Sequence, residues 1–159
     1  MMSKIKKSLH EFYETKVKDM MQTTKSALPC VEENAAIEQV FSLLMKNDYV
    51  WVVDSKDPKQ ILGVITESDM ITLLSPPVTS LQTFDKPDSR SLQFGVPLTA
   101  EEIMSKNPIT ASPEETIRDV IAKMKQHKVK QLPVVDHHGM LLGDITLHQF
   151  IDTYCRELI

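Results

Sequence analysis

The 159-residue chain lacks several features that whole classes of protein require. It has two cysteines, Cys30 and Cys155, whose spacing fits neither a disulfide framework nor a metal site, so free thiols in a reducing compartment are expected. No apolar run approaches the ~20 residues that a membrane-spanning helix needs. The start, Met1 to Lys7, is basic but lacks the apolar stretch of a secretory signal. These absences predict a soluble, cytoplasmic protein.

Nucleic-acid binding, metal binding and catalysis also find little support in the sequence. The net charge of -4 argues against nucleic acid as the main partner, because phosphate binding needs a basic patch. The five histidines include an adjacent pair, His137 and His138, and are otherwise scattered, so no metal site is predicted. No nucleophile stands with a base, and no phosphate-binding glycine loop occurs. We therefore expect neither an enzyme nor a required cofactor.

A seven-residue phrase occurs twice, 80 positions apart, at Gly63 to Asp69 and at Gly143 to Gln149. Both copies keep the frame Gly-x-Ile-Thr, but the first ends on a carboxylate and the second on an amide. The duplication extends upstream, where two helical stripes with the spacing i, i+3, i+4, i+7 have the same offset. The stripes are Ile37, Val40, Phe41 and Leu44, and Ile117, Val120, Ile121 and Met124. The chain therefore contains two copies of one packing unit.

Each copy predicts a short strand, a helix, two strands joined by a turn, and a second helix. The expected fold is α/β, with the two repeats packed by pseudo-twofold symmetry. The expected boundaries are an N-terminal helix at 1–16, the first repeat at 17–75, a proline-rich linker at 76–98 and the second repeat at 99–159. Capping signals are expected at Thr99 and at Ser112-Pro113-Glu114-Glu115, the second of which predicts the start of the main helix of repeat two. The lysines Lys123, Lys125, Lys128 and Lys130 are expected to form a solvated face.

These motifs, in this order and found twice, resemble a tandem pair of cystathionine-β-synthase (CBS) domains, the Bateman module. The second repeat carries Ile103-Met104, Pro108-Ile109-Thr110, Leu132-Pro133-Val134-Val135-Asp136 and Gly143-Asp144-Ile145-Thr146. The first carries Met20-Met21, Val52-Val53-Asp54 and the Gly63 to Asp69 phrase. The resemblance spans Val17 to Tyr154. It implies a stand-alone regulatory module that binds an adenosyl compound such as AMP, ADP, ATP or S-adenosylmethionine.

The resemblance also implies which residues would bind the ligand. The ribose and phosphate motif Gly-x-x-Thr-x-x-Asp is complete in the first repeat. The first site would comprise Gly63, Thr66, Asp69, Leu28, Pro29 and Cys30, and a weaker second site would comprise Ile109, Thr110, Lys130, Pro133, Gly143, Thr146 and Gln149. One departure is Val50-Trp51, where the second repeat has Leu132-Pro133, so the first base pocket is expected to be reshaped.

The position of Asp69 allows two interpretations. A carboxylate there can accept hydrogen bonds from both ribose hydroxyls, and charge-assisted bonds are the stronger class. Thr66-x-x-Asp69 is also close to a helix-capping box, which needs no ligand. Thr146-x-x-Gln149 is a capping box without the charge. Lys128 or Lys130 could reach a ligand phosphate, or could simply be solvated.

The sequence predicts a homodimeric sensor of an adenine nucleotide that alters its contacts with an unidentified regulated protein. The alternative is a ligand-free CBS pair whose function is dimerisation or docking. Both interpretations give the protein no membrane partner and make nucleic acid an unlikely one.

Overall fold

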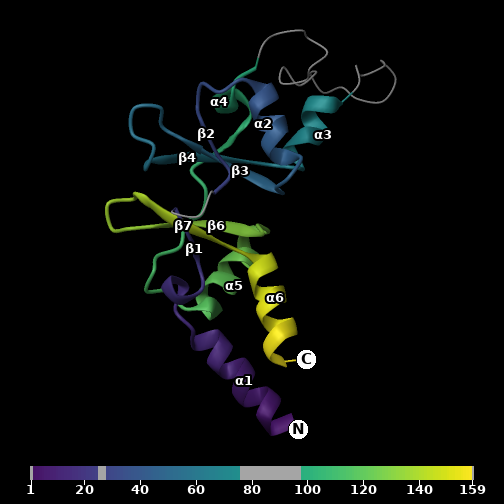
Figure 1. Ribbon diagram of the computed structural model, residues 1–159, viewed down its shortest axis with the longest axis vertical. Helices are drawn as coiled ribbons and strands as arrows, with labels where there is room; N and C mark the ends of the chain where they lie inside the picture. Colours follow the sequence, from purple (N-terminus) through teal and green to yellow (C-terminus); the bar gives the residue numbers. More distant parts are fainter. Residues whose placement is uncertain (1, 25–27, 76–97, 159) are drawn as a thin grey trace. The chain divides into compact units, whose positions relative to one another are not determined.

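The structure is a computed structural model that describes residues 2–24, 28–75 and 98–158 (Figure 1). The chain divides into two compact units. One comprises residues 29–107 and is called here the first-repeat unit; the other comprises residues 1–28 together with 108–159 and is called the second-repeat unit. The two units are described separately.

In the first-repeat unit, a sheet carries helices on one face. The elements are β2 (Cys30–Glu32), α2 (Ile37–Leu44), β3 (Tyr49–Val53), β4 (Ile61–Thr66), α3 (Asp69–Leu74), α4 (Ala100–Ile103) and β5 (Ser105–Lys106). The described strands are ordered β2-β3-β4-β5. β2 runs parallel to β3, and the other pairs are antiparallel. The predicted order of strand, helix, strand, strand and helix is therefore confirmed for this repeat.

The core of this unit lies between the sheet and α2. Val50, Val52 and Ile65 alternate onto the helix-facing side of their strands, as the period of two in a β-strand requires. Ile37 and Val40 of the predicted stripe are buried against them, and Phe41 and Leu44 are partly buried. Trp51 is fully buried, as its place in a central strand predicted.

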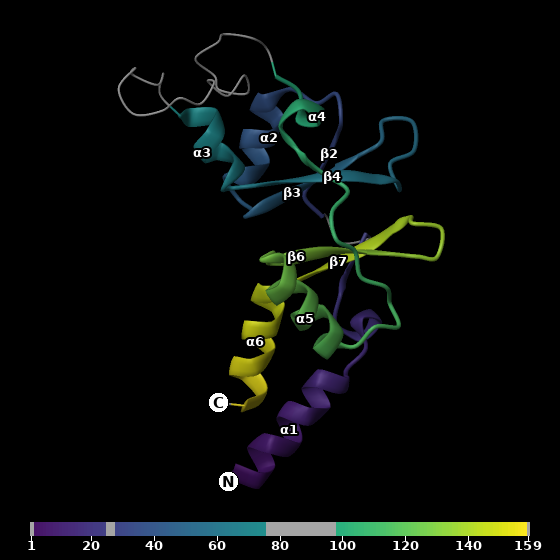
Figure 2. The ribbon, with the colours of Figure 1, turned by 180° about the vertical axis from the view of Figure 1, so that it is seen from behind.

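The second-repeat unit has the same plan with an additional N-terminal helix. Its elements are α1 (Met2–Glu14), the short 3-10 helix η1 (Val17–Asp19), β1 (Gln22–Thr23), α5 (Ile117–His127), β6 (Gln131–Val135), β7 (Leu141–Thr146) and α6 (Leu147–Leu158). The strand order is β1-β7-β6 among the described residues. Helix α1 contacts α5 and α6, as both ribbon views show (Figures 1 and 2).

Aromatic packing attaches α1 to this unit. Phe12 is buried and meets the ring of Phe150 edge-on, with 5.9 Å between ring centroids. The guanidinium of Arg118 on α5 lies 5.2 Å from the Tyr13 ring centroid and pairs with Glu14 at 3.0 Å. The N-terminal helix expected at 1–16 corresponds to α1, Met2–Glu14, which packs on the second-repeat unit.

Each unit is completed by a segment that is remote in sequence. In the second-repeat unit, β1 pairs with β7, with Thr23 opposite Gly143. In the first-repeat unit, β5 pairs with β4, with Lys106 opposite Gly63. The two pairings are equivalent, so each copy of the repeated phrase has a short strand lying along it.

Two local predictions are wrong. The main helix of the second repeat begins at Ile117 and is capped by Thr116 with Asp119; it does not begin at Ser112-Pro113. Ser112 does donate its backbone N–H to Glu115 at 3.0 Å, but this bond closes a turn that precedes the helix. The short strand expected before the main helix of the second repeat is reduced, among the described residues, to a single bridge between Ala111 and Val134.

Other local predictions are confirmed. Thr99 and Glu102 form a capping box at the start of α4. The turn after Asp136 joins β6 to β7, with Gly139 at a φ of 77°. The predicted linker at 76–98 lies outside the described residues except for Leu98, which is buried in the core. No helix among the described residues is long and apolar enough to cross a membrane.

Candidate functional site

The first copy of the repeated phrase brings Thr66 and Asp69 together at the end of β4. The Asp69 carboxylate accepts the backbone N–H of Thr66 on Oδ2 at 2.8 Å. The Thr66 hydroxyl lies 2.8 Å from that of Ser68 and 3.4 Å from the same Asp69 oxygen. Within the described residues, Asp69 Oδ1 receives no hydrogen bond. Asp69 is half-buried, so one oxygen orients the carboxylate and the other retains its acceptor capacity.

The second copy has the same backbone contact but a different side-chain arrangement. Gln149 Oε1 accepts the Thr146 N–H at 2.8 Å, and the Gln149 N–H donates to the Thr146 hydroxyl at 3.3 Å. The predicted capping box is therefore confirmed. In addition, Gln149 Nε2 donates to the backbone carbonyl of Met20 at 3.1 Å. The oxygen and the nitrogen of this amide thus both have partners inside the unit.

The two glycines of the phrase have a packing role. A Cβ placed on Gly143 would lie 1.9 Å from the backbone oxygen of Gln22 on β1. A Cβ on Gly63 would lie 2.6 Å from the Met104 sulfur and 2.7 Å from the Ser105 backbone oxygen. All three distances are far inside normal contact. The absence of a side chain at these positions is therefore required for β1 and β5 to approach, whether or not a ligand binds.

The predicted base-binding residues of the first site lie at the same end of the sheet as Thr66. The Pro29 carbonyl accepts the N–H of Trp51, and Tyr49 on β3 pairs with Thr66 on β4. Pro29 and Thr66 therefore stand two strands apart, which is roughly 10 Å at the usual strand spacing. Leu28 and Cys30 flank Pro29 and are half-buried.

The equivalent residues of the second-repeat unit share this arrangement. The Pro133 carbonyl accepts the N–H of Ala111, so Ile109 and Thr110 lead into this bridge. The carbonyl of Lys130 accepts the N–H of Leu147 at 2.8 Å, which places Lys130 beside the start of α6. Its side chain is exposed. Asp48 occupies the same position in the first repeat, since its carbonyl accepts the N–H of Glu67.

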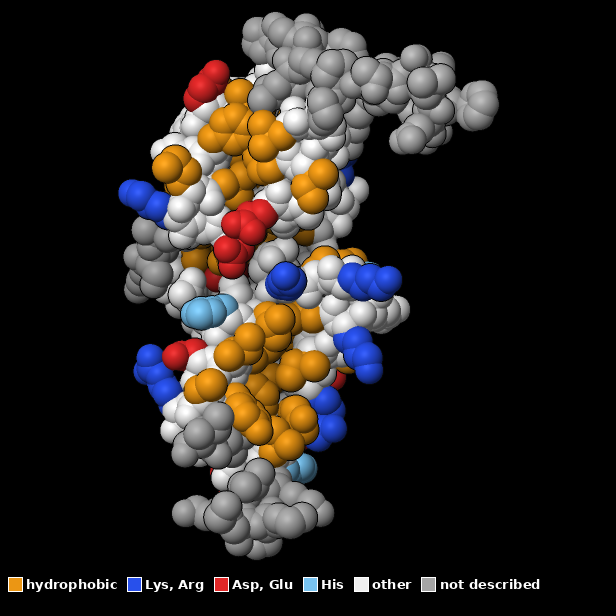
Figure 3. Space-filling model, turned by 90° about the vertical axis from the view of Figure 1, so that its right-hand side faces the viewer, with side chains coloured by type: hydrophobic (Ala, Val, Ile, Leu, Met, Phe, Trp, Pro, Cys, Tyr) orange, Lys and Arg blue, Asp and Glu red, His pale blue; other side chains and the backbone are white. Residues whose placement is uncertain are grey.

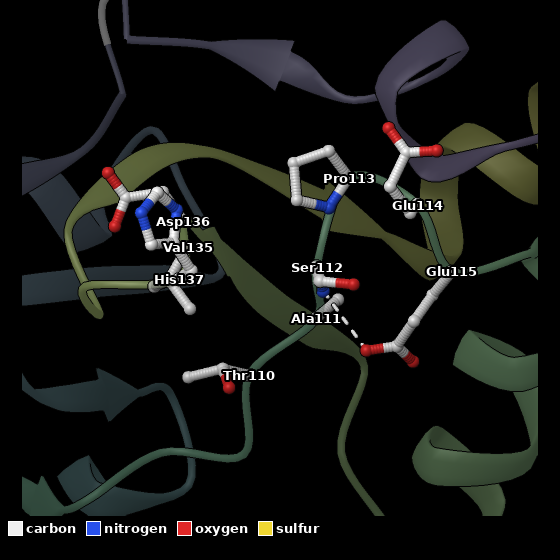
Figure 4. A pocket seen from close by; sticks show the side chains of 9 residues that line it. All are labelled: Thr110, Ala111, Ser112, Pro113, Glu114, Glu115, Val135, Asp136 and His137. Atoms are coloured by element: carbon white, nitrogen blue, oxygen red, sulfur yellow. Dashed lines mark hydrogen bonds between the residues drawn. The ribbon is translucent and has the colours of Figure 1, made fainter.

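Two open pockets occur at equivalent places, at the opposite end of the strands from these motifs. One, of about 370 Å³, lies in the second-repeat unit (Figure 4). It is lined by Thr110, Ala111, Ser112, Pro113, Glu114, Glu115, Val135, Asp136 and His137. The other, of about 440 Å³, is lined by Cys30, Val31, Glu32, Asn34, Ala35, Gln39, Val53 and Pro58. Of the predicted site residues, Thr110 and Cys30 line these pockets, whereas neither copy of the repeated phrase does.

Lys123 supports the pocket of the second-repeat unit, which the sequence did not predict. Its ammonium group donates to the Thr110 carbonyl at 2.8 Å and to the Glu115 carboxylate at 2.7 Å. Glu115 in turn accepts the Ser112 N–H across the pocket wall, the bond drawn in Figure 4. The expectation of a solvated Lys123 is therefore wrong, because the side chain is half-buried and makes two bonds. The signal available in the sequence was Glu115, eight residues before Lys123. Side chains on a helix pair at separations of three or four residues, so this spacing did not predict the contact.

The carboxylates of Glu115 and Asp136 at this pocket already accept hydrogen bonds from neighbouring residues. Asp136 accepts the N–H groups of Met140 at 3.0 Å and His138 at 2.8 Å. The Met140 N–H is the main cause that lowers the pKa of Asp136 below its ordinary value of 3.8. No cluster of metal-ligating side chains occurs among residues 2–24, 28–75 and 98–158.

The chain belongs to the CBS domain family, whose model matches residues 17–76 and 100–155. It is 27% identical over 87% of its length to a homoserine O-acetyltransferase of Methanosphaera stadtmanae, but it spans only 24% of that enzyme. An uncharacterised protein of Methanocaldococcus jannaschii is 28% identical, with 86% of this chain and 89% of that protein covered. The predicted tandem pair of CBS domains is therefore confirmed.

Solved structures support the same fold. The crystal structure of CBSX2 in complex with AMP has a TM-score of 0.68 at 20% identity and covers 89% of this chain and 96% of that one. A CBS domain pair in complex with 5'-methylthioadenosine and S-adenosyl-L-methionine has a TM-score of 0.68 at 23% identity, covering 90% and 98%. At these identities the comparison establishes the fold.

Proposed function

We propose that the protein is a regulatory module that binds one adenosyl ligand per chain through Thr66 and Asp69. The observation that carries this proposal is the Asp69 carboxylate, which is oriented by one hydrogen bond and has a second oxygen available to a ribose hydroxyl. The structural neighbours crystallised with AMP or with S-adenosyl-L-methionine support the ligand class. Catalysis is not part of the proposal.

The remaining contacts follow from the sheet geometry. A ligand whose ribose contacts Asp69 would have its base within reach of Pro29 and Cys30, at the same end of the strands. Binding would link α3 to the start of β2. The ligand could change the relative stability of two conformations only by its difference in affinity for them, and a partner protein would sense that difference.

Isothermal titration calorimetry with AMP, ADP, ATP, S-adenosylmethionine and 5'-methylthioadenosine tests the proposal. Heat from at least one of them, with about one site per chain, is expected. Asp69→Asn is sharper than an alanine substitution, because the amide oxygen still accepts the Thr66 N–H while the charge is lost. Since hydrogen bonds to charged groups contribute about 1.5–3 kcal/mol, the affinity should fall roughly 10- to 100-fold.

The matched control is Asp48→Asn, which removes the same charge from an exposed residue near the same end of the first-repeat unit. It should leave the affinity within about twofold. No heat with any ligand would refute the sensor function. Equal losses in the two variants would refute a specific role of Asp69 in binding.

A dimerisation or docking module is the second candidate, and exposed apolar side chains favour it. Hydrophobic side chains gather on the face of each unit seen in Figure 3. Ile71 and Leu74 on α3 are 73% and 67% exposed, and Ile151 and Tyr154, at the equivalent positions of α6, are 52% and 43% exposed. A single exposed apolar side chain is common on protein surfaces and needs no explanation. Here, however, the same two helix positions are apolar and accessible in both repeats.

A second copy of the chain is the proposed occupant, because a surface that recurs in both repeats suits a symmetric partner. Light scattering after size exclusion should give a dimer for the wild type and a monomer for Ile71→Glu with Ile151→Glu. Met45, the C-cap residue of α2, is 87% exposed and provides the control: Met45→Glu should leave the dimer intact. A monomeric wild-type protein would rule out this interface.

A further inference from the structure

The amide of Gln149 differs from the carboxylate of Asp69 in one chemical respect, which is that it can donate a hydrogen bond. Gln149 uses this donor on the carbonyl of Met20, 129 positions away in sequence, at 3.1 Å. Met20 closes the η1 turn, where its own N–H donates to Val17 at 3.0 Å. The bond therefore joins the start of α6 to the segment that connects α1 with β1.

The first-repeat unit provides an internal comparison. Because Thr23 pairs with Gly143 as Lys106 pairs with Gly63, the counterpart of Met20 is Ile103. An ionised Asp69 can only accept hydrogen bonds, so it cannot make the equivalent bond to the Ile103 carbonyl. The backbone bonds around this segment are the same in both units: Ala100 and Glu101 donate to Ala35 and Glu33, both at 2.9 Å, as Val17 and Lys18 donate to Glu115 and Pro113.

The segment that Gln149 contacts is attached to the unit on both sides of Met20. Residues Thr15 to Lys18 run along residues 113–117, with Val17 donating to Glu115 at 2.8 Å and Lys18 to Pro113 at 3.1 Å. Beyond them, β1 is two residues long and its side chains are exposed. Val17 is fully buried, whereas Met20 is only partly buried. A bond at Met20 thus lies midway between the buried anchor and the short strand.

We infer that Gln149 is a positioning residue that holds residues 17–23 on the second-repeat unit, and that the second copy of the phrase acts as a structural connection in place of a ribose site. Both polar atoms of the Gln149 side chain are already engaged, by Thr146 and by Met20. A ribose hydroxyl would have to displace one of these bonds without gaining a charged acceptor. This conclusion about ligand number rests on the proposed function, whereas the positioning role does not.

Gln149→Glu tests the inference, because glutamate keeps the shape and the acceptor for Thr146 but loses the donor. It places a carboxylate against the Met20 carbonyl at pH 7. The Met20 carbonyl is partly buried, and a hydrogen bond of this kind contributes about 0.5–1.5 kcal/mol, so backbone amides of residues 17–23 should exchange with deuterium up to roughly tenfold faster than in the wild type. Amides of β3 and β4 in the first-repeat unit should be unchanged.

A lower pH gives a signature that loss of packing would not produce. Below the ordinary glutamate pKa of about 4.3, the acid form of the side chain carries an O–H that can donate to Met20 again. The excess exchange relative to wild type should therefore shrink at pH 3.5. The neighbouring charged groups, Lys18, Asp19, Lys130, His148 and Asp152, are present in every variant, so the comparison at equal pH removes their contribution.

Two further variants complete the experiment. Gln126→Glu adds the same charge to an exposed position on α5 and should leave the exchange of residues 17–23 unchanged. Gln149→Met retains the size without donor or acceptor, so its faster exchange should not be rescued by acid. If Gln149→Glu fails to fold, Gln149→Met still tests the bond, because unchanged exchange in residues 17–23 would overturn the inference.

The inference would also be overturned if Gln149→Glu exchanged like the wild type, if acid did not reduce its excess, or if Gln126→Glu behaved identically. None of these outcomes depends on a ligand. An absence of heat in the calorimetry would refute the proposed function and leave the exchange result intact. Two bound adenosyl ligands per chain, with the second lost in Gln149→Met, would overturn the claim that the second copy holds no ribose.

Discussion

Replacing Gly143 by alanine should be among the most damaging single-methyl additions to this protein. The new Cβ would stand 1.9 Å from the Gln22 backbone oxygen, 3.0 Å from the Gln22 carbonyl carbon and 3.1 Å from the Thr23 Cα. All three atoms belong to the backbone of β1, so no side chain can rotate away. Relief requires β1 to move from β7 by more than 1 Å, roughly the deficit from a normal contact near 3.4 Å.

The expected magnitude follows from what that movement breaks. Overpacking alone costs about 1–3 kcal/mol. Displacing β1 also loosens the pairing around Thr23 and the bond from the Thr24 N–H to the Leu142 carbonyl at 3.1 Å, and hydrogen bonds of this kind contribute about 0.5–1.5 kcal/mol each. A total loss of about 3 kcal/mol in the free energy of unfolding is expected. For a chain of this size it lowers Tm by roughly 6–12 °C.

Gly63→Ala is the matched comparison and should be milder. Its closest new contact is the Met104 sulfur at 2.6 Å, on a flexible side chain, although the Ser105 backbone oxygen at 2.7 Å must also shift. A loss of about 1–2 kcal/mol is expected. Urea unfolding followed by circular dichroism measures both variants. A Gly143→Ala protein as stable as the wild type, or a Gly63→Ala protein less stable than Gly143→Ala, would refute this packing argument.

Three further predictions concern the second-repeat unit. The pKa of Asp136 lies below 3.8, mainly because its carboxylate accepts the Met140 N–H. The contribution of Asp136 to stability should therefore be complete above pH 3.8 and disappear as the pH falls through the folded-state pKa. An NMR titration that gave a pKa at or above 3.8 for this carboxyl would contradict the prediction. Lys123→Met should cost about 1 kcal/mol in urea unfolding by removing the ammonium that bridges Glu115 and a backbone carbonyl, and no loss would mean that the partly exposed pair is screened. Phe12→Ala should cost about 3–5 kcal/mol and release α1 to proteolysis, and a protein that resists cleavage in α1 would show that the helix is held by other contacts.

The periodic parts of the sequence predicted the fold well because their physical cause is local. The stripes at Ile37 and Ile117 became helices whose apolar faces are buried, and the paired valines became the buried strands β3 and β6. The start of α5 was misplaced because Ser112-Pro113 and Thr116 both carry capping signals. Tertiary bonding decides between them: Ile117 donates to the Thr15 carbonyl, a contact that no local pattern contains.

The division of the chain into units could not be predicted from the repeat. In sequence each copy is continuous, yet residues 1–28 pack with residues 108–159. Two-residue strands such as β1 carry almost no periodic signal, and the partner residues of β1 are more than one hundred positions away. The bond from Gln149 to Met20 was invisible for the same reason, whereas its capping role was readable from four adjacent residues.

The two copies of the phrase also separate what packing requires from what a ligand could use. The glycines serve strand approach in both copies, and Thr66 and Thr146 both present a backbone N–H to the side chain three residues later. Since these positions have the same structural role in each unit, their presence is no evidence for a ligand. The chemistry differs at one position. The Asp69 carboxylate has an oxygen that accepts no hydrogen bond within the described residues, whereas the Gln149 amide nitrogen donates to the Met20 carbonyl. The proposed sensor function therefore depends on Asp69, and Asp69→Asn, which leaves the backbone contact in place, is the substitution that separates ligand binding from packing.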